Sequence, residues 1–111
     1  MSMATLGSLE LAVLLTVVRL GDGAYGLAIR RDLSARTRHD YSVGAIYTTL
    51  QRLEEKGFLS SRTSDPLPVR GGRSRRHFAV TGAGRKAVRN AQRVATSVWA
   101  GFGTPTTAEP T

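Results

Sequence analysis

Residues 42–59 read SVGAIYTTLQRLEEKGFL, and this stretch decides the predicted fold. Apolar side chains recur through it at steps of three, four and three, namely Val43, Ile46, Leu50 and Leu53. This spacing predicts an amphipathic helix whose apolar stripe faces the core. Ser42 stands before the stripe as an N-cap and Gly57 after it as a helix stop. The stretch therefore predicts one helix with both of its ends marked.

The hydropathy period changes to two after Gly57, which predicts a two-stranded hairpin. Residues 58–63 form one expected strand and residues 76–80 form its partner. The loop between them, SDPLPVRGGRSR, carries three arginines, Arg70, Arg73 and Arg75. A merely soluble loop would rarely need three cations, so the hairpin is expected to present a basic tip.

Two more helices are expected before residue 42. Residues 8–20 are apolar almost all round, with a narrow polar edge at Glu10 and Thr16, so this helix is expected to be buried on most faces. The pattern then breaks at three glycines, Gly21, Gly23 and Gly26. A short amphipathic helix follows to about Arg38, with Ile29 and Leu33 facing inwards.

The glycine segment GDGAYG, residues 21–26, formally matches the dinucleotide-binding pattern G-x-G-x-x-G. Asp40 follows this segment at nearly the sequence spacing expected for a ribose-binding acid. However, no second parallel strand follows, and 111 residues cannot hold a doubly wound sheet. We therefore interpret these glycines as the tight connection between the first two helices.

A long helix capped by Thr81 is expected after the hairpin. A broad apolar stripe runs along it: Ala87, Val88, Ala91, Val94, Ala95, Val98, Trp99 and Phe102. The stripe is broader than one small domain needs, and an isolated monomer would leave its far end exposed. Burial against a second copy is therefore expected.

Composition restricts the class of protein. Sixteen basic against eight acidic side chains give a net charge of +8, which favours a polyanionic partner. Fourteen of the sixteen are arginines, a bias that genome composition could also produce. The chain has no cysteine, which excludes disulfides and thiolate metal sites and permits the cytoplasm. The apolar run 11–18 is too short to cross a bilayer, and no basic stretch precedes it as in a signal peptide. We expect a cytoplasmic protein with no membrane partner.

Three helices followed by a basic hairpin form the architecture of a winged helix-turn-helix, whose third helix enters the major groove of DNA. The predicted fold class is mainly α with a small two-stranded β wing (α+β). Residues 1–80 are the expected DNA-binding domain, 81–102 a C-terminal dimerisation helix packed on the same domain, and 103–111 a disordered tail.

The predicted DNA contacts follow from this architecture. The face of the third helix opposite its apolar stripe carries Gly44, Ala45, Tyr47, Thr48, Gln51 and Arg52. The amide of Gln51 can read adenine with two hydrogen bonds, while the alternative is an ordinary solvated helix face. Arg52 could reach a phosphate or pair with Glu54 or Glu55.

Tyr25 and Ser42 are expected near phosphate at helix N-termini, with simple capping as the alternative for Ser42. The wing arginines are expected on the DNA backbone or in the narrow groove.

Three pieces of the sequence resemble the PadR family of bacterial transcriptional regulators. They are AYGLAI (24–29), SVGAIYTTLQRLEEKGFL (42–59), and the paired arginines before HFAVTGAGRKAV (77–88). The most specific piece is a set of six types at fixed spacing, Tyr47, Leu50, Arg52, Leu53, Glu54 and Gly57. The resemblance runs from about Leu6 to Phe102.

The resemblance implies a homodimer in which the first and last helices pack across a two-fold axis. It places two recognition helices about 34 Å apart on a palindromic operator. The expected dimer or effector residues are Leu11, Leu15, Val94, Val98, Trp99 and Phe102. Trp99 falls where some short relatives hold flat aromatic compounds and release DNA; the alternative is an aromatic that only seals the dimer. Repression is the usual role.

No enzyme is expected, because no nucleophile, base and acid combination, carboxylate pair or phosphate loop stands out. His39 and His77 lie far apart without acidic or cysteine company, so neither a metal nor a cofactor is expected. The main alternative function is a winged-helix module that binds protein rather than specific DNA.

Overall fold

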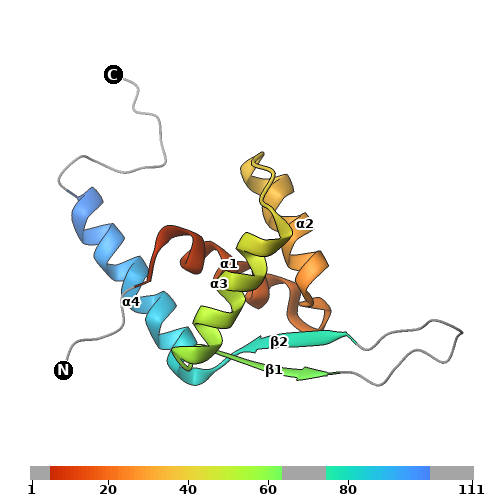
Figure 1. The fold of residues 1–111 in the computed structure, drawn as a ribbon. Helices are drawn as coiled ribbons and strands as arrows, with labels where there is room; N and C mark the ends of the chain where they lie inside the picture. The colour runs from red at the N-terminus through yellow and green to blue at the C-terminus, as the bar shows by residue number, and fades with distance from the viewer. Residues whose placement is uncertain (1–5, 64–74, 101–111) are drawn as a thin grey trace, which may run out of the picture.

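The computed structural model describes residues 6–63 and 75–100. In chain order its elements are α1 (Ser8–Leu20), the 3-10 turn η1 (Gly21–Gly23), α2 (Gly26–Thr37), α3 (Val43–Glu55), β1 (Leu59–Thr63), β2 (Arg76–Val80) and α4 (Gly82–Trp99). Helices α1 to α3 gather above the hairpin, and α4 leaves from its end (Figure 1). The predicted class, mainly α with a two-stranded wing, is confirmed.

The core lies where α1, α2 and α3 meet the hairpin. Ile46, Leu50 and Leu53 of α3 are fully buried there, as their spacing predicted. Val43 was expected in the same stripe but is exposed, because it lies in the first turn of α3, beyond the edge of the core. Both predicted ends of the helix are confirmed. Ser42 Oγ accepts a hydrogen bond from the Ala45 amide at 3.0 Å, and Gly57 has a φ of +81° that other residues rarely adopt.

The burial pattern of helix α1 differs from the prediction in two ways. Thr16, predicted on a polar edge, is fully buried, and its hydroxyl donates to the Ala12 carbonyl at 2.8 Å, so the buried oxygen is satisfied. Leu15 and Val18 are exposed, so fewer faces of the helix are buried within one chain than predicted; the assignment of Leu15 to a dimer interface stays a prediction. The helix is apolar on more sides than one copy of the chain covers.

The wing is an antiparallel pair whose register runs from Leu59 opposite Val80 to Thr63 opposite Arg76. The strand begins one residue later than predicted, because the Phe58 amide donates to the Leu53 carbonyl and still belongs to the end of α3. A third segment joins β2. The Phe78 amide donates to the Ala24 carbonyl at 2.8 Å, and Tyr25 forms an isolated bridge with His77. The root of the wing is thus fixed to the start of α2.

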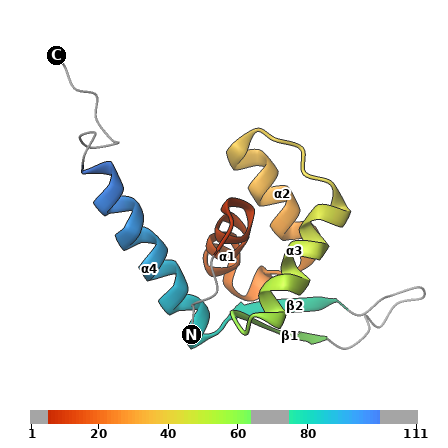
Figure 2. The ribbon, with the colours of Figure 1, turned by 60° about the vertical axis from the view of Figure 1, so that its left-hand side comes forward.

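Helix α4 begins with the predicted cap. Thr81 Oγ1 accepts from the Gly84 amide at 3.0 Å and donates to the Gly57 carbonyl at 2.7 Å, so the start of α4 is joined to the end of α3. The helix then leans away from the three-helix body, and its far end stands apart (Figure 2). It ends at Trp99 rather than residue 102; Phe102 and the predicted tail lie outside the described residues.

Candidate nucleic-acid interface

The surface of α3 opposite the core carries the side chains that were predicted from the sequence to contact the major groove of DNA. Tyr47, Thr48 and Gln51 are exposed, while Ile46, Leu50 and Leu53 on the other side of the same helix are buried. Gly44 adds no side chain near its start, and Ala45 is half-buried. The outward face is therefore narrow at its beginning and polar along its length, which suits entry into a major groove.

Tyr47 packs over the first residue of α2. A Cβ atom placed on Gly26 would lie 2.0 Å from the Tyr47 hydroxyl oxygen and 2.3 Å from its Cζ atom. Gly26 is therefore more than the turn residue that its sequence pattern indicated, since its missing side chain leaves the space that the Tyr47 ring occupies. This packing sets how close the start of α2 comes to α3.

Tyr25, Arg75 and His77 stack where the wing meets α2. The guanidinium of Arg75 lies 4.4 Å from the centre of the Tyr25 ring, and this ring meets His77 edge-on at 6.0 Å between centres. A cation over an aromatic face is held by the ring quadrupole. Tyr25 was predicted to bind phosphate and that stays a prediction; the geometry shows that it holds a wing cation. Arg70 and Arg73 lie outside the described residues.

Ser42 and Arg52 were assigned alternative roles from the sequence. The capping bond of Ser42 is present, which gives the capping alternative a physical basis. Among the described residues, Arg52 forms no ion pair with Glu54 or Glu55, the two carboxylates proposed from the sequence. Glu54 is bonded to Arg76 and Ser61, and Glu55 accepts from the Gln51 amide at 3.5 Å. A phosphate contact by Arg52 remains a prediction.

Polar contacts connect α2 to α1 and to the turn before α3. Asp32 of α2 accepts from Arg19 of α1 at 2.6 Å and from Arg36 at 3.3 Å. The hydrogen bond from Arg19 outweighs burial and lowers the pKa of Asp32. Arg30 donates to the Tyr41 carbonyl at 2.6 Å, which closes the turn before α3. The Asp32 pairs thus join α1 to α2, while the Arg30 bond holds the turn that leads into α3.

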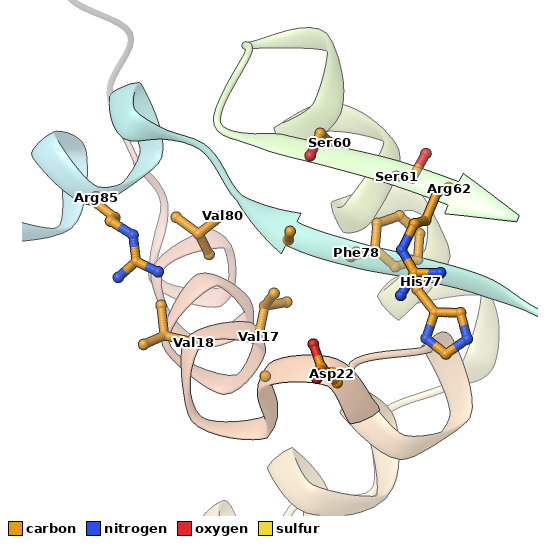
Figure 3. A pocket seen from close by; sticks show the side chains of 12 residues that line it. Val17, Val18, Asp22, Ser60, Ser61, Arg62, His77, Phe78, Val80 and Arg85 are labelled. Atoms are coloured by element: carbon orange, nitrogen blue, oxygen red, sulfur yellow. The ribbon is translucent and has the colours of Figure 1, made fainter. Parts of the chain in front are cut away.

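A hollow of about 310 Å³ lies between the end of α1, η1 and the wing (Figure 3). Its lining includes Asp22, Ser60, Ser61 and His77, the residue types of a nucleophilic triad. They are not connected as one. Nδ1 of His77 is buried with no hydrogen-bond partner among the described atoms, and Ser61 Oγ is engaged by Glu54 and Arg76. Among the described residues, no hydrogen bond joins a serine of this hollow to His77.

The described residues contain no group of three His, Cys, Asp or Glu side chains arranged to hold a metal ion. Within the same residues, no helix is long and apolar enough to cross a membrane.

A larger groove, of about 920 Å³, runs along α4. Its lining combines the apolar residues Leu6, Phe58, Ala87, Ala91 and Val94 with the cations Lys56, Lys86, Arg89 and Arg93. Of the predicted interface residues, Val94 lines this groove. Leu11 is half-buried, whereas Leu15 is 42%, Val98 60% and Trp99 47% exposed. A single chain thus leaves much of the apolar surface of α1 and α4 in water.

The sequence matches one known protein family over most of its length. Residues 14–90, more than half of the chain, match the model of the transcriptional regulator PadR-like family. No curated protein sequence matches significantly.

Solved structures share the fold. A PadR-like transcription factor from Bacteroides fragilis is 21% identical, with a TM-score of 0.67 over 81% of this chain and 82% of its own. A PadR family transcriptional regulator from Eggerthella lenta is 24% identical, with a TM-score of 0.65 over 86% and 84% of the two chains. A transcriptional regulator from Clostridium thermocellum is 18% identical, with a TM-score of 0.68 over 88% and 92%. From the family match and the winged-helix fold together, the chain belongs to the PadR-like family of transcriptional regulators.

Proposed function

We propose that the protein is a sequence-specific DNA-binding regulator that acts in the cytoplasm and represses transcription. The observation that carries this proposal is the exposed polar face of α3 beside the Arg75 and Tyr25 stack. A helix face of this kind reads base edges, and a wing cation next to it binds the flanking backbone. The net charge of +8 supplies the long-range attraction.

The proposed active form is a homodimer. Exposed apolar side chains on α1 and α4, together with the groove along α4, are the support for this part of the proposal. Burying such surface stabilises a complex by about 25 cal/mol per Å². A two-fold axis at α4 would present both α3 helices to one duplex, with their centres about 34 Å apart on a palindromic site.

Release by a flat aromatic effector is the third part of the proposal. Trp99 is half-exposed at the end of α4, next to the apolar stripe of Val94 and Val98. Indole is a good stacking surface for a planar ring, and a ligand held there would change the packing of the two protomers. A tryptophan that only seals the dimer would be insensitive to such compounds.

The test is a fluorescence anisotropy titration of the DNA upstream of the protein's own gene, with an unrelated duplex beside it. Gln51→Ala should weaken specific binding by about tenfold or more and relax the preference for one base pair. Gln92→Ala, an exposed amide on α4, is the matched control and should bind as the wild type does. Equal, weak binding to both duplexes by the wild type would favour a protein-interaction module instead.

A further inference from the structure

The C-terminal end of α3 is joined to both wing strands by a closed ring of three side chains. Ser61 Oγ of β1 donates to Glu54 Oε2 at 2.6 Å, and Arg76 Nε of β2 donates to Ser61 Oγ at 3.0 Å. The ring closes where Arg76 Nη2 donates to Glu54 Oε1 at 2.9 Å. The sequence did not predict this cluster: Glu54 was named there as part of the family resemblance and as a partner for Arg52 on the same helix, not as a partner of the wing strands.

The strand register explains how the ring forms. Ser61 lies opposite Phe78 and Thr63 lies opposite Arg76, so Ser61 and Arg76 are diagonal neighbours on one face of the sheet. The guanidinium of Arg76 also lies 5.6 Å from the centre of the Phe78 ring, which is buried in the core. The Glu54 carboxylate can reach both strands only when the wing holds one orientation relative to α3.

The ring is expected to contribute little to folding stability. The side chain of Arg76 is 57% exposed and that of Glu54 is 29% exposed, and ion pairs at the surface contribute little to the free energy of unfolding. The ring has a larger effect on where the wing lies relative to α3. Arg76 begins β2 and directly follows Arg75, whose guanidinium lies over Tyr25 beside the outward face of α3.

We propose that Glu54 is a positioning residue for DNA binding: through Ser61 and Arg76 it sets the orientation of the wing relative to the recognition helix. The inference rests on the proposed function, because it assigns the ring a role in placing wing cations on DNA. Loss of the Glu54 carboxylate leaves the fold and the bond from Phe78 to Ala24 intact but frees Ser61 and Arg76 of the two strands relative to α3.

The experiment compares Glu54→Gln with Asp32→Asn. Asp32 is a matched control, because it is also an ion-paired carboxylate, 24% exposed, but it joins α1 to α2. Both substitutions remove one negative charge, so any general gain in attraction to DNA is the same. Glu54→Gln should bind the upstream duplex about tenfold more weakly than Asp32→Asn, at a similar midpoint of thermal unfolding.

Hydrogen–deuterium exchange without DNA separates the possible outcomes. Glu54→Gln should exchange faster than the control in segments 59–63 and 76–80, and the double variant Glu54→Arg, Arg76→Glu should restore protection. Unchanged exchange would show that the ring of Glu54, Ser61 and Arg76 does not hold the wing strands. Faster exchange with unchanged duplex affinity would overturn its role in DNA binding. Failure of the wild type to bind any duplex would refute the proposed function, whatever the exchange data show.

Discussion

Gly84→Ala is the substitution whose cost the structure defines most closely. Gly84 is buried in the first turn of α4, and a Cβ atom there would lie 2.3 Å from the Phe58 carbonyl oxygen and 2.8 Å from Val80 Cγ1. The nearest of these atoms is backbone, so it cannot rotate away as a flexible side chain would. The start of α4 would have to move, and the cap between Thr81 Oγ1 and the Gly84 amide would be strained.

Overpacking of this kind costs about 1–3 kcal/mol, and a weakened N-cap adds about 1 kcal/mol. The higher helix propensity of alanine offsets about 1 kcal/mol of these costs. The free energy of unfolding should therefore fall by about 1–3 kcal/mol, measured by urea denaturation followed by circular dichroism. Gly82→Ala on the same turn is the control. Nothing lies within 4 Å of its Cβ position, so it should be neutral or slightly stabilising. Equal stability of the two variants would refute the packing described between α4 and the wing.

Three further predictions concern other parts of the fold. Gly26→Ala should displace the Tyr47 ring and cost about 1 kcal/mol, and this cost should vanish in a Tyr47→Ala background; additive effects in a double-mutant cycle would contradict the packing of Tyr47 over Gly26. Burial raises the pKa of Glu10, but bonds from Lys56 and the Gly7 amide outweigh it, so the net pKa lies below 4.5. The advantage of wild type over Glu10→Gln in urea unfolding should be present above pH 4.5 and lost as pH falls through the lowered pKa; a constant difference would count against the pair. Val98→Glu should sediment as a single chain where wild type sediments as a dimer, and a wild-type monomer would exclude the proposed interface.

The helices and the wing were predictable because their signals are local. Ser42 and Thr81 cap helices with a bond to an amide three residues on, and the stripe through Ile46, Leu50 and Leu53 needs only helical periodicity. The errors arose where the tertiary structure decides. Thr16 is buried with Val13 and Val17 because that side of α1 packs on the core, and its hydroxyl is satisfied within its own helix. Val43 is exposed because the core ends before it.

The candidate site was predictable as a face but not as a set of interacting side chains. Exposure of Tyr47, Thr48 and Gln51 follows from the period of α3. The Tyr25 and Arg75 stack and the Glu54 and Arg76 pair join residues far apart in the sequence, and only the register of the wing brings them together. Spacing along one helix could not reveal them.

The central claim is that two copies of the α3 face and the wing bind one DNA duplex. The most direct measurement is the affinity for the upstream duplex across a salt series, for wild type and Arg75→Ala. Removing one cation from a phosphate reduces the slope of log affinity against log salt by about 1. Since the substitution removes one such cation from each protomer, the slope of the dimer should fall by about 2. An unchanged slope, or no preference for the upstream duplex over an unrelated one, would contradict the account.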